Sequence, residues 1–219
     1  MRKLSLVSLS ALVLAGCAAS SAETAPAPAA TAAPAPAPYA PVIPKGTGIF
    51  AEPSNLPFQA PDFSKIKESD YEPAIEQGIT ILLAEVDAIA NNPEAPTFEN
   101  TFVAMEKSGA MLTRVMYVFS ALTSANTNDN LDAIDTRVSP KLAAMRDAIT
   151  LNPKLFARVK TIYDNRASLG LAPDQLQVVE LTYENMVRNG ALLSAADKAK
   201  LSDINGKLST LQTEFGQKL

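Results

Sequence analysis

The amino-acid sequence predicts an all-α fold between residues 62 and 219, built of antiparallel helices joined by short turns. Apolar residues recur at spacings of three and four along this stretch, which is the period of a helix with one buried face. Asn, Pro and Gly interrupt the pattern where helices are expected to end. No alternating run of β-branched residues occurs, and no hairpin-type turn lies between two such runs.

The first helix is predicted to begin at a capping box, Ser69-Asp70-Tyr71-Glu72, in which the Ser and Glu side chains bond reciprocally to backbone N–H groups. Asn91-Asn92-Pro93 predicts its end. Its buried stripe consists of Tyr71, Ile75, Ile79, Leu82, Val86 and Ile89.

A second helix is predicted from Thr97, with Gly109 as a possible break and a polar turn at residues 126–130 after it. Its inner face consists of Phe98, Thr101, Met105, Leu112, Met116 and Phe119. A third helix is predicted over residues 129–149 and contains Pro140, where we expect a kink. Its inner face consists of Leu131, Ile134, Val138, Leu142 and Met145.

Three further helices are predicted from their start signals. Asn152-Pro153 combines a cap with Pro at the first helical position. That helix carries Leu155, Val159 and Ile162 on its inner face and ends at Gly170. Pro173 opens the next helix, which ends near Gly190, and Ser194 with Asp197 opens the last one.

The last helix carries an apolar stripe that continues to Leu219, with no capping Gly or closing Pro after it. A stripe of this kind needs a partner that buries it. An earlier helix could supply the partner, or it could lie in residues missing from this chain, and we expect the second. The stripe consists of Leu201, Ile204, Leu208, Leu211 and Phe215.

Residues 1–16 are predicted to be a lipoprotein signal peptide. Arg2 and Lys3 precede an apolar run that is shorter than the roughly 20 residues of a membrane-spanning helix. The following Leu14-Ala15-Gly16-Cys17 resembles the bacterial lipoprotein box, so we expect cleavage before Cys17 and lipidation of its thiol. The alternative is an ordinary signal with a chance Cys. Ala18 resembles the sorting pattern for the outer membrane, so we expect a lipid anchor on its periplasmic face.

Residues 17–61 are predicted to be a lipidated Cys followed by a disordered tether. Ten of the 16 prolines lie between Pro26 and Pro61, and Ala/Pro-rich chain cannot bury enough apolar surface to offset the entropy cost of ordering. The domain boundaries expected are therefore 1–16, 17–61 and 62–219.

Composition excludes several classes of function. The formal net charge is −4, which argues against a nucleic-acid partner. The absence of His excludes Ser-His-Asp and Cys-His catalysis and imidazole zinc sites. A single Cys permits no intramolecular disulfide. We therefore expect no catalytic and no metal-binding residue in this chain.

Three constellations have a functional and a structural interpretation. The Asn-rich loop 126–130 could suggest calcium, but Leu131 and Arg137 stand where an EF-hand needs Gly and Glu, so helix capping is favoured. The acidic residues Glu99, Glu106, Asp132 and Asp135 are expected on solvated faces. The residues Met105, Met111, Met116, Tyr117 and Phe119 could line an apolar groove but are expected in the core. No phosphate loop or Gly-x-Ser-x-Gly motif occurs.

Several strings, in order over residues 55–219, resemble the N-terminal region of the thimet-oligopeptidase-like zinc metallopeptidases, and the bacterial peptidyl-dipeptidase (dipeptidyl carboxypeptidase) branch more than oligopeptidase A. Each string is weak alone, but together they are specific. They are Leu56-Pro57-Phe58, Pro61-Asp62-Phe63, the stretches 91–101, 122–128 and 151–156, and Thr213 to Gly216.

This resemblance implies a longer, two-lobed helical enzyme that releases dipeptides from short peptides. In that family a His-Glu-x-x-His helix and a further Glu hold zinc. That motif is absent here, so the resemblance implies an N-terminal lobe, cut at its C-terminus, that helps to form the substrate channel. The expected partners are short peptides, the membrane and the missing catalytic lobe. The alternative is a non-catalytic helical lipoprotein used for binding or scaffolding.

Overall fold

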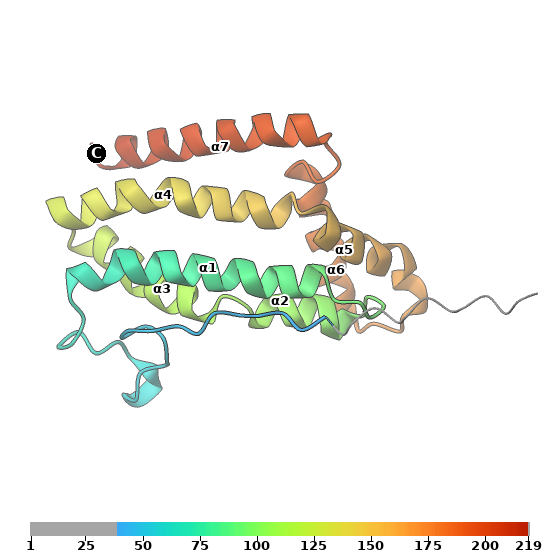
Figure 1. The fold of residues 1–219 in the computed structure, drawn as a ribbon, viewed down its shortest axis with the longest axis horizontal. Coiled ribbons are helices and arrows are strands. Elements are labelled where there is room, and N and C mark those ends of the chain that lie inside the picture. The colour runs from blue at the N-terminus through green and yellow to red at the C-terminus, as the bar shows by residue number, and fades with distance from the viewer. Residues whose placement is uncertain (1–38, 219) are drawn as a thin grey trace, which may run out of the picture. The chain divides into compact units, whose positions relative to one another are not determined.

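A computed structural model describes residues 39–218, and within this range every regular element is helical (Figure 1). The predicted all-α fold class is therefore confirmed. The long helices are α1 (Tyr71–Ala90), α3 (Ala110–Ala125), α4 (Asp129–Thr150), α5 (Pro153–Asn165), α6 (Pro173–Arg188) and α7 (Ala195–Gly216). Shorter ones are η1 (Pro57–Gln59), η2 (Glu68–Asp70), the π-helical η3 (Glu99–Val103), α2 (Ala104–Lys107) and η4 (Arg166–Ser168).

The first hydrophobic cluster joins α1, α3 and α4. Its centre is aromatic: the ring of Tyr71 lies between Phe50, at 5.8 Å, and Phe119, at 5.4 Å. Ile75, Val115 and Val138 are fully buried around it. The apolar stripes predicted for these three helices therefore meet in one core.

The second cluster lies where the C-terminal half of α1 meets α5 and α6. Val159, Val179 and Ile162 are buried there, with Phe102 from η3. Leu82 and Ile149 pack against both clusters. Val159 and Ile162 were predicted on an inner face, whereas the contributions of Val179 and Phe102 were not.

Three predicted helix starts are confirmed by their caps. The side chains of Asn128, Asn152 and Ser194 each accept hydrogen bonds from N–H groups of the first turn that follows. The break at Gly109 is real: its φ of 75° is a conformation that glycine adopts without a steric penalty. Pro140 lies inside α4 and does not end that helix.

The capping box predicted at Ser69 is wrong. Ser69 is exposed within η2, and no side-chain bond caps α1. The reciprocal arrangement lies two residues earlier, where the Lys67 N–H donates to Asp70 Oδ2 at 2.8 Å and the Asp70 N–H donates to the Lys67 carbonyl at 2.9 Å. A short 3-10 turn precedes α1 and takes over the role expected of Ser69.

The predicted tether extends too far toward the C-terminus. Residues 39–61 belong to the same compact unit as the helices, and Phe50 is only 5% exposed. The Thr47 N–H donates to Gln77 Oε1 at 2.6 Å, and the Tyr39 hydroxyl donates to Asp87 Oδ2 at 3.1 Å. A few apolar and polar anchors order this Pro-containing segment against α1, although its composition alone predicts disorder.

Two other predictions concern residues that the structure does not describe. The signal peptide 1–16 and Cys17 lie outside residues 39–218, so their roles stay predictions. Within the described range, no helix is both long enough and apolar enough to cross a bilayer.

Candidate functional site

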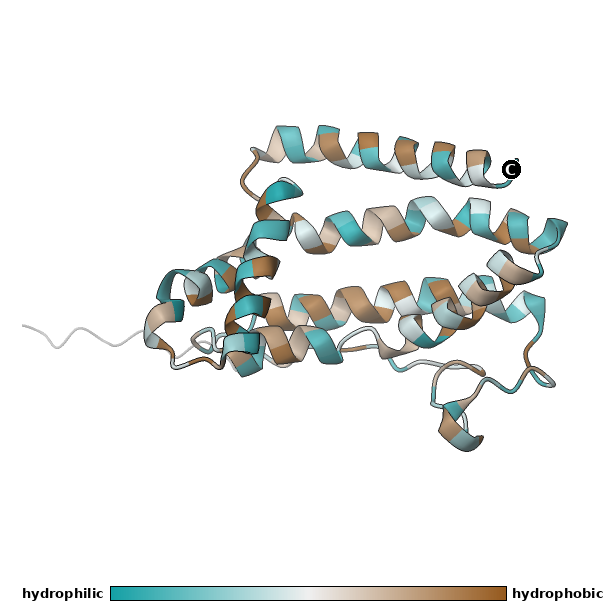
Figure 2. Ribbon diagram, turned by 180° about the vertical axis from the view of Figure 1, so that it is seen from behind, coloured by the Kyte–Doolittle hydropathy of each residue, from teal (hydrophilic) through white to brown (hydrophobic). Residues whose placement is uncertain are grey.

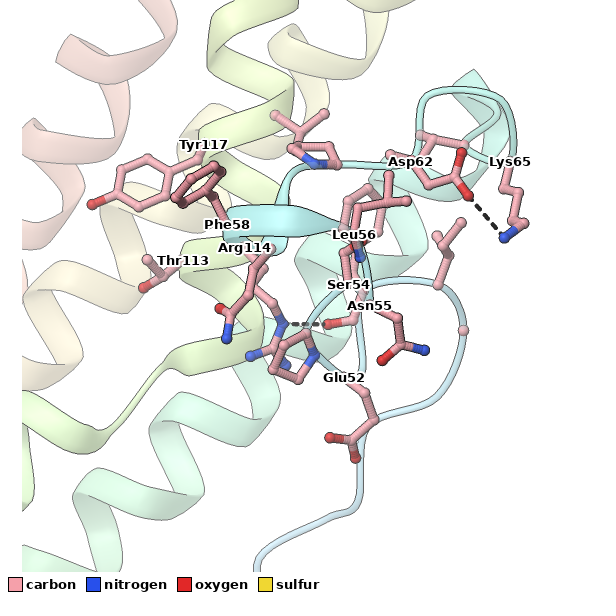
Figure 3. Close-up of a pocket in the computed structure, with 18 residues that line it drawn as sticks. Glu52, Ser54, Asn55, Leu56, Phe58, Asp62, Lys65, Thr113, Arg114 and Tyr117 are labelled. Atoms are coloured by element: carbon pink, nitrogen blue, oxygen red, sulfur yellow. Dashed lines mark hydrogen bonds and ion pairs between the residues drawn. The ribbon is translucent and has the colours of Figure 1, made fainter.

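The best-defined hollow of the described surface lies between α3 and the loop formed by residues 48–66 (Figure 3). Its volume is about 630 Å³, which is within the size range of small-molecule pockets. Apolar groups dominate its lining, among them Ile49, Leu56, Phe58, Tyr117 and Val118.

Arg114 of α3 holds the loop in place. Its Nε donates to the carbonyl of Phe50 at 2.9 Å, and an Nη group donates to the carbonyl of Ala51. Because both acceptors are backbone atoms, Arg114 holds the backbone of the loop, and the buried Phe50 ring adds a side-chain anchor. The guanidinium is thereby already engaged when it lines the pocket.

The loop presents an aromatic side chain on a strained backbone. Phe58 and Gln59 have φ values of 59° and 56°, in the left-handed region where non-glycine residues cost on the order of 1 kcal/mol or more. The Phe58 side chain is fully exposed, and Tyr117 of α3, which also lines the pocket, is 76% exposed. Because strained backbone clusters at functional sites, this loop is a candidate contact surface.

The polar groups of this pocket do not form a catalytic arrangement. Lys65 Nζ lies 2.8 Å from Asp62 Oδ2, and hydrogen bonds from Lys65 and Ser64 lower the pKa of the Asp62 carboxyl. An ionised, paired carboxylate is a poor general base at neutral pH. The hollow can therefore bind an apolar group.

The Asn-rich loop acts as a helix cap, as predicted. Asn128 Oδ1 accepts from the N–H groups of Asn130 and Leu131, both at 3.0 Å. The Nδ2 groups of Asn128 and Asn130 donate to the Glu68 carboxylate at 2.8 and 2.7 Å. These bonds lower the pKa of the Glu68 carboxyl. The amides are thus committed to tying η2 to the start of α4.

The predicted acidic residues are not brought together. Glu99 and Glu106 are exposed, and Asp132 and Asp135 are half-buried on α4. Among the described residues, no group of three or more His, Cys, Asp or Glu side chains could hold a metal ion. Of the methionines and aromatics weighed as a groove, Met111 and Phe119 are buried in the core and Tyr117 is not.

Sequence reasoning missed the role of Arg158, which is 6% exposed. Its Nη1 donates to the carbonyls of Asn92 and Glu94 at 2.9 and 3.0 Å, and its Nη2 donates to Asn100 Oδ1 at 2.7 Å. The Asn100 and Thr97 side chains also bond reciprocally to each other's N–H groups. Arg158 therefore holds the stretch 91–101, which connects α1 to η3. The only sequence signal for this role was an Arg on an otherwise apolar helix face.

Comparison with known proteins gives the chain a context. No protein-family model matches it. It is 43% identical over 173 residues to the dipeptidyl carboxypeptidase of Salmonella typhimurium and 44% identical over 170 residues to that of Escherichia coli. These matches cover 79% and 78% of this chain but 25% of each relative. The chain resembles the N-terminal region of these proteins and spans about a quarter of their length.

Proposed function

We propose that this chain is the N-terminal part of a peptidase of the dipeptidyl carboxypeptidase type, which acts on short peptides and releases C-terminal dipeptides. The observation that carries the proposal is the identity of 43–44% over nearly four fifths of the chain. One of the stretches that carry the resemblance, residues 91–101, is held by Arg158 as a connection between α1 and η3.

In this proposal the chain shapes the substrate channel and supports the catalytic part without cleaving peptides itself. The residues present do not fit a zinc site, because the sequence contains no His and the described part holds no cluster of metal-ligating side chains. The metal that the family implies would be held by another part of the longer protein. The exposed apolar rings at the pocket beside α3 suit contact with peptide or protein.

We further propose that the protein is anchored by lipid at Cys17 to the periplasmic face of the outer membrane. The support is the Leu14-Ala15-Gly16-Cys17 sequence after a short apolar run, with Ala18 after it. Several acyl chains at one Cys would hold the protein firmly, since each buried methylene adds about 0.8 kcal/mol.

A chimera tests the function directly. Residues 39–219 replace the matching N-terminal quarter of the Escherichia coli relative, and dipeptide release is measured on a short peptide with a free C-terminus. We expect activity within tenfold of the intact relative, with none on the same peptide carrying an amidated C-terminus. The relative without its N-terminal quarter is the control and should be inactive. A chimera that folds but releases no dipeptide would refute the proposal.

A further inference from the structure

The packing of α7 reverses the usual orientation of an amphipathic helix. The side of α7 against α4 is polar and small: Asn205 Nδ2 donates to Asp147 Oδ1 at 2.8 Å, and Ser209 Oγ donates to the Ser139 carbonyl at 3.1 Å. Near its C-terminus, Gln217 Nε2 donates to the Asp132 carbonyl at 2.9 Å. Hydrogen bonds therefore attach α7 to α4, whereas an amphipathic helix ordinarily packs through its apolar side.

The apolar stripe of α7 faces away from that contact. Ile204, Leu208, Leu211 and Phe215 are 58%, 48%, 62% and 65% exposed. Figure 2 shows hydrophobic bands recurring along α7, which lies at an edge of the helical body beside α4. Leu201, at the start of the stripe, is half-buried and lies beside Gly190. Within residues 39–218, no other element buries the remaining four residues, so the alternative that an earlier helix covers the whole stripe is wrong.

The spacing of the stripe specifies the shape of what covers it. Together with Leu201, its residues follow the pattern three, four, three, four along the chain. That is the a/d pattern of a seam between two helices that cross at about 20°. The complementary surface is consequently another amphipathic helix with an apolar stripe of its own.

The size of the stripe distinguishes a tethered partner from a separate one. If each side chain presented the roughly 200 Å² of an aromatic residue, which is an upper bound for Ile and Leu, the four exposed residues would offer at most roughly 450 Å². A stable interface between separate proteins needs about 800 Å² from each. A helix in the same polypeptide needs less, because the tether supplies a high effective concentration.

We propose that the outer stripe of α7, defined as residues 204, 208, 211 and 215, is the seam on which a helix from the downstream part of the longer peptidase docks. This rests on the proposed function, which places about three quarters of the polypeptide outside the matched region. The stripe is then an internal interface of the whole enzyme, and a second copy of this chain is not its occupant.

Thiol labelling tests the seam separately from activity. In a Cys17→Ser background, Leu208→Cys reports on the stripe, and Asp203→Cys, at an exposed position on another side of α7, is the matched control. Both thiols should react rapidly with a maleimide in the 219-residue chain. In the chimera with the Escherichia coli remainder, made free of other reactive thiols, labelling at 208 should slow at least tenfold while labelling at 203 changes less than threefold.

Each other outcome overturns the inference. Equal labelling at 208 in both proteins would show that no helix covers the stripe, even if the chimera is active and the proposed function stands. Protection already present in the 219-residue chain at every concentration would mean that α7 turns its stripe inward. Protection that grows with concentration, with a dimer mass in light scattering, would assign the stripe to a second copy. If the chimera does not fold, the same pair of thiols is placed at the matching α7 positions of the intact Escherichia coli relative, and equal labelling at both positions then refutes the seam.

Discussion

Replacement of Arg158 by Met is expected to lower the free energy of unfolding by about 2–3 kcal/mol. The change keeps the aliphatic packing of a side chain that is 6% exposed and removes its hydrogen bonds to Asn92, Glu94 and Asn100. Each bond from a charged donor contributes about 1.5 kcal/mol or more. Burial of the charge offsets part of this, because it lowers the pKa of Arg158 and leaves the Nε without a partner.

Urea unfolding of the full chain at 25 °C measures this effect. Arg158→Ala should cost more, about 3–5 kcal/mol, because it also opens a cavity. Arg158→Lys should cost about 1–2 kcal/mol, since one ammonium group cannot reach all three acceptors. Arg146→Met, on the exposed side of α4, is the control and should stay within about 0.5 kcal/mol of the parent. If the stability of Arg158→Met also falls within that range, the hydrogen bonds of Arg158 to the stretch 91–101 do not stabilise the fold.

Three further predictions concern substitutions of single residues. Gly78→Ala should destabilise the chain by about 1–3 kcal/mol, because the new Cβ would lie 2.9 Å from the α3 backbone. Gly206→Ala has open space around it and should stabilise the chain by about 0.5–1 kcal/mol. Equal urea midpoints for the two variants would contradict this. The Arg137 side chain lowers the pKa of Glu72, so the unfolded state binds more protons below about pH 4.5, and the stability from this pair is lost as the pH falls through the folded pKa. Arg137→Met should therefore make the urea midpoint depend less steeply on pH in this range. An unchanged slope would exclude the pair as the cause. Cys17→Ser should move the protein from the membrane to the soluble fraction in ultracentrifugation, and an unchanged distribution would exclude the lipid anchor.

The helical part of the fold could be predicted because its signals are local. Asn128, Asn152 and Ser194 cap their own first turns, and Gly109 breaks its own helix. The misplaced capping box at Ser69 is also a local error, because a 3-10 turn shifted the reciprocal hydrogen bonds by two residues. Period and caps determine where helices lie, within a turn or so at their ends.

Features that depend on contacts between distant residues could not be predicted. Arg114 binds carbonyls more than 60 residues away, and Arg158 binds a loop at a similar separation. Both sit on helix faces where nothing nearby in the sequence indicates an acceptor. The order of residues 39–61 was missed for this reason, since Phe50 gains its burial from α1 and α3.

The position of α1 across both hydrophobic clusters has a consequence for how the molecule loosens. Residues of α1 belong to both hydrophobic clusters, and Leu82 and Ile149 pack against both. Contacts around Tyr71 in the first cluster can persist while α5 and α6 detach, because those two helices contribute their buried residues to the second cluster. Amide protons of α5 and α6 are therefore expected to exchange with solvent through a smaller opening than those in the middle of α1.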